Sequence, residues 1–338
     1  MLVLELAAGI LRPLRSTLDL KDPPMQLRQP ARRSVVLSAA MCVCACSPVQ
    51  PEVISLLGRP LYPIQDSEKR VTLEADLESA REELAQHPED PAKIVWVGRR
   101  LGYLWRMNEA IAVYTEGIAK HPSYAPLYRH RGHRYISLRR FEDAEADLAK
   151  AARLIEGQPD QVELDGMPNE LNIPLTTTAF NVWYHLGLTR YLQGDLEDAL
   201  SAYEETLKFS LEHDDNLVAT LDWMYMTLRR LGHDDEAESL LQPIHAQMRI
   251  IENHAYHRRL LMYKRELQPE DLLDGENAGT LDWATQGYGV GNWHLCNGQQ
   301  DKARDFFEGV VAGDYWPAFG FIAAEVELAR MRDSAYAP

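Results

Sequence analysis

A spacing of 34 residues recurs in the middle of this chain and constrains its fold more than any other feature. Three pairs of matching positions carry it: Gly98 and Gly132, Ala110 and Ala144, and the dipeptides His87-Pro88 and His121-Pro122. Two antiparallel helices approach closely only where a small side chain leaves room, and a proline after the second helix ends it. The spacing therefore predicts helical hairpins stacked as a repeat array, in which no single large core is needed.

Five units match this pattern at several positions each, and they resemble tetratricopeptide repeats (TPR). The first two cover residues 91–124 and 125–158, and the third begins with the W-x-x-L-G pattern at Trp183. The fourth has Tyr225 where a small residue is usual, and a degenerate unit precedes the last match, which contains Gly291 and Ala303. The resemblance implies an all-α, TPR-type helical solenoid, with antiparallel helix pairs stacked into a right-handed superhelix over residues 67–331.

The two ends of the solenoid are predicted as single helices. Residues 67–86 form a strong helix, with Ser67 as a plausible N-cap, and cover the first end of the array. Residues 316–331 form a C-terminal capping helix, with Pro317 near its start. We expect residues 332–338 to be a disordered tail.

Residues 1–45 are interpreted as a signal segment. From Met25, a basic start and a twelve-residue apolar run precede Cys46, and translation is expected to begin at Met25. The quartet ending at Cys46 resembles the lipobox of bacterial lipoproteins, which implies that Cys46 is lipidated and becomes the new N-terminus. The alternative is a mature, buried N-terminal helix with scattered cysteines. Residues 46–66 carry four prolines and no helical period, so we expect an extended tether there.

The composition limits the class of partner. A formal net charge of −16 argues against a general nucleic-acid binder, because phosphate contacts need a basic surface. Of the four cysteines, only Cys46 and Cys296 would remain after processing, which leaves no disulfide framework and no cysteine metal cluster.

The inner surface of such an array is lined by the first helix of each repeat. The side chains predicted to face inward form a partner-binding groove: Arg99, Arg129, His130, His133, Asn181, Tyr184, His185 and Leu188. This basic, aromatic face suits an acidic or C-terminal peptide segment, since arginine forks bind carboxylates. The alternative is that these residues are solvated surface or pair with the chain's many acidic residues. Val95 and Arg99 depart from the carboxylate clamp of chaperone adaptors, so that clamp is not expected.

An insert at residues 159–178 separates the second and third repeats, and it contains Gly166, Pro168 and Pro174. Inserts of this length are usually functional or disordered. We expect either a lid across the mouth of the groove or a floppy excursion from it.

Signals for catalysis and metal binding are weak. The sequence lacks HExxH, GxSxG, a P-loop and paired CxxC motifs. Two histidine pairs, His130 with His133 and His254 with His257, are spaced for one helix face, but zinc needs at least a third ligand. We expect no enzyme activity, no metal and no cofactor.

These features together predict a non-catalytic scaffold or adaptor that binds a protein or peptide, an acidic one being a good match. The alternative is a hydrolytic enzyme or small-ligand binder, with the insert closing over His130, His133 and His185. Self-association through an apolar end is a third interpretation. We expect a bacterial cell-envelope location, lipid-anchored and facing the periplasm. Ser47 after the lipidated cysteine favours the outer membrane over the inner. The sequence around the insert and the end WHLCNGQQDKA also resemble a group of bacterial TPR lipoproteins, a resemblance that implies no activity.

Overall fold

The computed structural model describes residues 49–273 and 280–335, all within the compact unit Pro48–Pro338. The predicted signal segment and its lipidation site, Cys46, lie outside the described residues. In the described part, no helix is long and apolar enough to cross a membrane.

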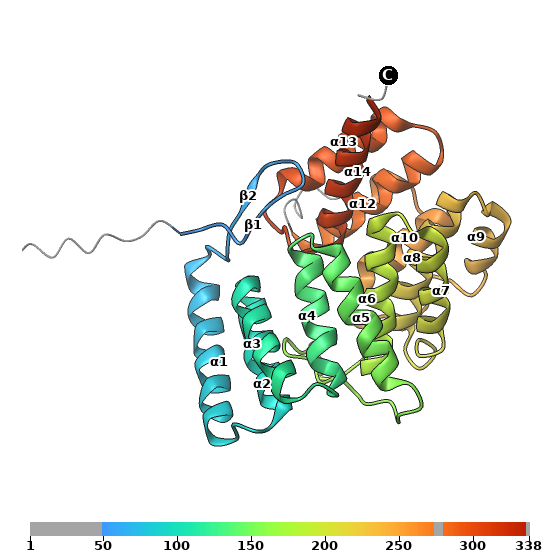
Figure 1. Ribbon diagram of the computed structural model, residues 1–338. Helices are drawn as coiled ribbons and strands as arrows, with labels where there is room; N and C mark the ends of the chain where they lie inside the picture. Colours follow the sequence, from blue (N-terminus) through green and yellow to red (C-terminus); the bar gives the residue numbers. More distant parts are fainter. Residues whose placement is uncertain (1–48, 274–279, 336–338) are drawn as a thin grey trace, which may run out of the picture. The chain divides into compact units, whose positions relative to one another are not determined.

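The described residues form fourteen α-helices and one short β-hairpin (Figure 1). The strands are β1 (Val53–Ile54) and β2 (Pro60–Leu61). The helices, in chain order, are α1 (Ser67–Gln86), α2 (Pro91–Tyr103), α3 (Met107–Lys120), α4 (Ala125–Ser137), α5 (Phe141–Ile155), α6 (Thr178–Gln193), α7 (Leu196–Leu207), α8 (Asp214–Leu231), α9 (Asp234–Leu240), α10 (His254–Tyr263), α11 (Pro269–Leu272), α12 (Leu281–Cys296), α13 (Gln300–Ala312) and α14 (Phe319–Ala335).

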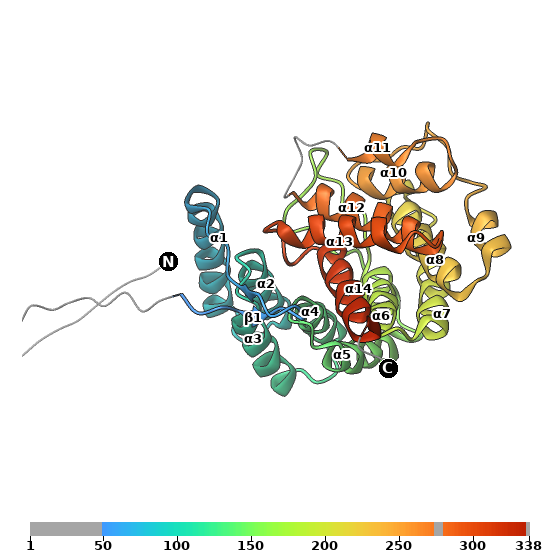
Figure 2. The same cartoon turned by 90° about the horizontal axis from the view of Figure 1, so that it is seen from above.

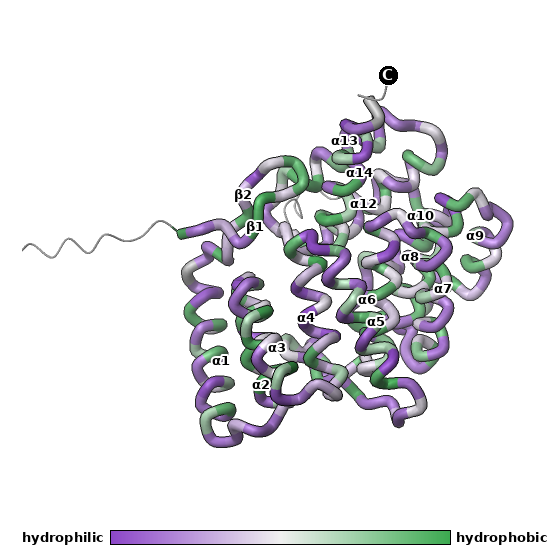
Figure 3. Tube along the Cα trace, viewed as in Figure 1, coloured by the Kyte–Doolittle hydropathy of each residue, from purple (hydrophilic) through white to green (hydrophobic). Residues whose placement is uncertain are grey.

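Consecutive helices pair as predicted, and the all-α, TPR-type architecture is confirmed. The hairpins are α2–α3, α4–α5, α6–α7, α8–α9 and α12–α13, and α10 with the one-turn α11 forms the degenerate unit. The leading helix α1 has the predicted bounds, but Asp66 is its N-cap in place of Ser67, because the Asp66 carboxylate accepts the backbone N–H groups of Glu68 and Lys69. Figure 3 shows α1 as largely hydrophilic with bands of hydrophobic residues, as expected of a helix that packs on one side only.

One contact closes four of the hairpins in the same register. A glycine on the first helix lies against a large side chain sixteen residues later, in the pairs Gly98–Tyr114, Gly132–Leu148, Gly187–Tyr203 and Gly291–Phe307. A Cβ on these glycines would lie 2.2–2.8 Å from the neighbouring side chain, well inside contact distance. In α8 this position is Tyr225, whose ring instead stacks on Tyr263 of α10. The residue sixteen positions after Tyr225 is Leu241, just past the end of α9, which is only seven residues long.

The segment before α1 is not the extended tether that we predicted. Strands β1 and β2 pair as an antiparallel hairpin, and Leu61 is buried. Arg59 donates to the carbonyl oxygens of Val311 and Gly313, and the Trp316 indole N–H donates to the Tyr62 carbonyl oxygen at 2.8 Å. The prolines of this segment exclude a helix but not a hairpin, and the surface that orders it comes from residues some 250 positions later.

The last helix does more than cap the end of the array. In Figure 2, α14 crosses from α12 and α13 toward α6. Its Glu325 forms an ion pair with Arg139 at the end of α4, at 2.6 Å, and only 1% and 2% of these side chains are exposed. Helix α14 runs to Ala335, so the predicted disordered tail is wrong for residues 332–335.

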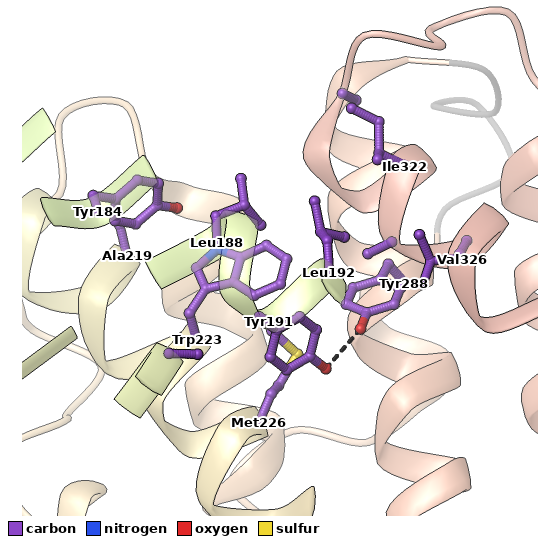
Figure 4. Packing of buried hydrophobic residues seen from close by; sticks show 14 of the residues in the cluster. Tyr184, Leu188, Tyr191, Leu192, Ala219, Trp223, Met226, Tyr288, Ile322 and Val326 are labelled. Carbon is purple, nitrogen blue, oxygen red and sulfur yellow. Dashed lines mark hydrogen bonds between the residues drawn. The ribbon is translucent and has the colours of Figure 1, made fainter. Parts of the chain in front are cut away.

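The inner face of the array is consequently a packed core over much of its length. Side chains of α6, α8, α12 and α14 interlock there (Figure 4). The hydroxyls of Tyr191 and Tyr288 are hydrogen-bonded at 2.7 Å across this core, linking α6 to α12. The open groove that we predicted from the repeats is therefore wrong for this part of the chain.

The repeated glycine contact predicts opposite effects of two alanine substitutions in one hairpin. Gly291→Ala places a methyl group 2.5 Å from the Phe307 ring, and we expect a loss of about 1–3 kcal/mol in the free energy of unfolding. Gly309→Ala on exposed α13 meets nothing within 4 Å and should stabilise the protein by about 0.5–1 kcal/mol. Urea unfolding followed by circular dichroism measures both. Equal effects of the two substitutions would contradict the packing argument.

The buried ion pair of α14 predicts a large loss on truncation. Glu325→Ala leaves the Arg139 guanidinium buried without a counterion, so the free energy of unfolding should fall by about 3–5 kcal/mol. The matched control is Asp143→Ala, which removes the half-exposed partner of Arg140 and should cost less than about 1 kcal/mol. If both variants unfold at the same urea concentration, α14 is not held by this pair.

Candidate functional site

The eight predicted groove residues all lie on first helices, as expected, but they do not line one open groove. Arg99 on α2, with Arg129 and His130 on α4, lies beneath the insert. The other five are covered by neighbouring elements: His133, Asn181, Tyr184, His185 and Leu188. The chain therefore fills its own inner face, from one side with the insert and from the other with α14.

Contacts between the two ends of the insert hold it in a defined conformation. Val162 and Thr177 form an antiparallel bridge, and the Glu163 N–H donates to the Thr176 carbonyl oxygen at 2.9 Å. Between these ends the chain runs across α2 and α4. It reaches α8, where Asn216 donates to the Leu175 carbonyl oxygen, and the segment before α10, where Asn169 donates to Glu252. Of the two alternatives for the insert, the lid agrees with the structure and the floppy excursion does not.

Two arginines of α2 hold the backbone of the insert. Arg99 donates to the carbonyl oxygen of Leu164 at 2.7 Å, and Arg100 donates to that of Gly166 at 2.9 Å. Gly166 is buried against the Tyr103 ring, and a Cβ there would lie 2.3 Å from the Tyr103 hydroxyl oxygen. At this position there is room for the backbone of the insert but not for a side chain.

A single carboxylate of the insert enters the basic part of the inner face. Glu163 Oε1 lies 3.0 Å from Arg129 Nη2 and 3.6 Å from His130 Nε2, and the Glu163 side chain is 12% exposed. Burial, reinforced by Arg129, holds the pKa of His130 well below its usual value, so this ring is neutral. Arg129 donates to His130 Nδ1 at 2.8 Å, which leaves the imidazole proton on Nε2, the nitrogen that faces Glu163.

The positive charge of this region exceeds the negative charge that the insert supplies. Arg134 also lies here, with its guanidinium against Gly102, and no described carboxylate forms an ion pair with Arg134 or Arg99. Three polar atoms are buried without a hydrogen-bond partner: Arg129 Nε, Arg134 Nε and Glu163 Oε2. Burial lowers the pKa of Arg134, an effect strengthened by Arg129 and Arg99. The insert therefore satisfies the donors of this face only in part.

Of the histidines of the hydrolase alternative, His130 and His185 are buried and His133 is partly buried, and they lie in different surroundings. His130 stacks on Tyr114 and faces Glu163. The rings of His133 and His185 lie 4.5 Å apart and pack on Phe319 of α14. A cavity of about 740 Å³ lies between the end of α5, the start of α6 and α7, and its lining includes Ile155, Trp183, Arg190 and Phe209 but no histidine.

Metal ligands are not clustered in the part of the chain that the structure describes. No group of three histidine, cysteine, aspartate or glutamate side chains there could hold a metal ion. In the second histidine pair, His257 Nε2 is hydrogen-bonded to the His245 carbonyl oxygen at 3.0 Å. Cys296 is a free thiol at the end of α12, and burial raises its pKa.

The sequence reasoning missed the partners of the groove residues. Arg100, Tyr103, Arg134 and Glu163 are not among the residues predicted from the sequence. A usable signal was present, because Glu163 lies between Val162 and Leu164, and alternation in an extended segment puts it on the opposite face.

No family model matches the chain, and no curated protein matches it. Among solved structures, it is similar to a tetratricopeptide repeat protein from Parabacteroides merdae, at 16% identity over 78% of this chain and 95% of that chain, with a TM-score of 0.45. It is also similar to YrrB, described as a TPR protein with an unusual peptide-binding site, at 17% identity over 76% and 99% of the two chains, with a TM-score of 0.40.

A third similar structure is the Cut9–Hcn1 hetero-tetramer of the APC/C, at 11% identity over 79% of this chain and 41% of that chain, with a TM-score of 0.45. The helix pairs of the present chain establish its architecture by themselves. These likenesses add no argument about what it binds.

The buried histidines predict that acid weakens the folded state around α4 and α6. Burial lowers the pKa of His133 and His185, so both rings stay neutral in the folded protein while they protonate in the unfolded chain below about pH 6.5. Their contribution to stability is thus present above that pH and is lost as the pH falls. We expect the free energy of unfolding to fall less between pH 7.5 and 5 in His133→Gln than in the native protein.

Asp222 changes the free energy of unfolding in the opposite direction as the pH falls, so the native protein and the His133→Gln variant are measured over the same pH range. Burial raises the pKa of Asp222 to about 7, against the attraction of Arg259, so protonation of this carboxyl in the folded state adds stability as the pH falls below 7. That contribution is common to both proteins and cancels in their difference. An identical pH dependence of the two proteins would show that His133 is not held neutral.

Proposed function

We propose that this protein is an interaction scaffold whose inner face on α2 and α4 binds an extended segment of another protein, in exchange with its own insert. The observation that carries this proposal is that the insert is bound as a peptide would be bound. Arginine side chains hold its carbonyl oxygens, and a basic site holds its acidic side chain. In this proposal the peptide groove expected from the sequence is limited to the part of the inner face that the insert covers.

The attachment of the insert rests mainly on polar contacts. Five of its apolar side chains remain 40–62% exposed: Val162, Leu164, Met167, Leu171 and Ile173. Because most of the stabilisation of a packed segment comes from buried apolar surface, this insert gains little from staying in place. Leu175, near the end of the insert, is buried and anchors that end. A segment that offers better partners to the arginines can replace residues 162–173 without exposing a hydrophobic core.

The scaffold is proposed to be lipid-anchored at Cys46 in a bacterial envelope, on the side away from the cytoplasm and preferably at the outer membrane. The support is the sequence pattern of residues 25–46. Glu52, six positions after Cys46, already belongs to the packed domain, because it accepts hydrogen bonds from Asn108 at the start of α3.

The exchange can be tested with the insert itself as the ligand. Val162 and Thr177 already pair as antiparallel neighbours. Replacing residues 163–176 by Asn-Gly connects these two residues through a two-residue hairpin turn. We expect this loop-shortened protein to bind a synthetic peptide of residues 159–178, and the native protein to bind it much more weakly, because its own insert occupies the site. Fluorescence anisotropy of the labelled peptide measures both affinities.

Two controls accompany this measurement. Arg129→Met in the loop-shortened protein should lower the affinity at least tenfold, since the buried ion pair with the acidic side chain is lost. Arg153→Met changes an exposed arginine of α5 and should leave the affinity unchanged. Failure of a folded loop-shortened protein to bind the peptide would refute the proposal, as would equal binding by the native protein.

A further inference from the structure

The way in which the insert lies on α2 and α4 specifies what a competing segment must contain. Three consecutive contacts define the site: the carboxylate of Glu163 on Arg129 and His130, the carbonyl oxygen of Leu164 on Arg99, and the backbone of Gly166 on Arg100 and Tyr103. The first contact selects a side chain, the second reads only the backbone, and the third excludes any side chain.

The side chains at the positions beside and between these contacts are not recognised by α2 or α4. Leu164 is 61% exposed, and Asp165 is also exposed, its carboxylate accepting the N–H of Met167 within the insert. Val162, just before the acidic residue, is 60% exposed. Side chains at these positions point away from α2 and α4 and do not contribute to recognition.

From this arrangement we infer that the partner segment carries an acidic residue followed, three residues later, by glycine. The inference rests on the proposed function and specifies its ligand as an extended segment with the pattern acidic-x-x-Gly. The acidic residue is the charged anchor, because the basic site offers three guanidinium groups and a histidine N–H. The glycine is required because a Cβ at its position would collide with both the ring and the hydroxyl of Tyr103.

A separate segment can also make a contact that the insert does not make. Glu163 uses only Oε1, while its Oε2 and Arg129 Nε are both buried without a partner. A carboxylate that meets Arg129 with both oxygens forms a paired, bidentate contact, which is stronger and more specific than a single one. The insert is tied at both ends to α5 and α6, whereas a partner segment is free to adopt that geometry.

The test uses variants of the peptide of residues 159–178 with the loop-shortened protein. Glu163→Gln should weaken binding at least tenfold, because it replaces the charged anchor by a neutral amide. Glu170→Gln is the matched control, since it makes the same chemical change at an exposed side chain without a described contact, and its affinity should stay within about twofold.

The glycine requirement is tested by rescue. The Gly166→Ala peptide should bind at least tenfold more weakly than the unchanged peptide, because the new methyl group has no room beside Tyr103. Tyr103→Ala in the loop-shortened protein creates that room and should bring the affinities of the two peptides within about twofold of each other. A loss that persists on the Tyr103→Ala protein would overturn the assignment of this contact.

A selection from random displayed peptides gives an independent result. On the loop-shortened protein it should enrich an acidic residue three positions before a glycine, and on the Arg129→Met variant this enrichment should disappear. Failure of the acidic-x-x-Gly pattern and failure of the scaffold proposal give different binding results. If the unchanged peptide binds but Glu163→Gln and Gly166→Ala bind equally well, the acidic-x-x-Gly pattern is wrong and the scaffold proposal stands. If the unchanged peptide does not bind, the scaffold proposal itself is wrong.

Discussion

Close contact between the two helices of each hairpin is the constraint on which the rest of this structure depends. A glycine on the first helix leaves room for the large side chain of a residue sixteen positions later, on the second helix. The second helices also contribute buried alanines to this contact: Ala110, Ala144, Ala199 and Ala303. Because this contact has the same register in four hairpins, each first helix turns the same face inward. The position of Arg99, Arg129 and His185 on the inner face is a consequence of that register.

An inner face made in this way has to be covered, and this chain covers it with its own residues. Helix α14 brings apolar side chains and Glu325 against α4 and α6, and a hydroxyl pair links Tyr191 to Tyr288. Charges enclosed in the core are paired, as in Arg139 and Glu325, which lie 2.6 Å apart and are almost fully buried. Breaking such a pair costs several kcal/mol because one charge stays buried alone, so these contacts hold the array in one arrangement.

The segment of the inner face beneath the insert differs from this core. It holds more guanidinium groups than carboxylates, and the insert that covers it leaves its apolar side chains between Val162 and Ile173 exposed. An acidic protein thus carries a local positive site whose present occupant is one glutamate of its own insert. Incomplete pairing is what distinguishes a site that can exchange its ligand from a core that cannot.

The sequence by itself determined the features that depend on local spacing. The 34-residue period, the bounds of α1 and the presence of a closing helix follow from residues that contact others within one or two hairpins. It also determined which side chains belong to the first helices, since helical periodicity is local.

Only the tertiary structure decided what covers those side chains. The hairpin at residues 53–61 replaced a predicted tether, α14 filled a predicted groove, and Glu163 became the partner of Arg129. The contacts that hold this hairpin, α14 and Glu163 in place join residues 34 to about 270 positions apart and are not repeated from one unit to the next. Local periodicity carries no information about such contacts, because they arise from the surfaces that the stacked repeats bring together in space.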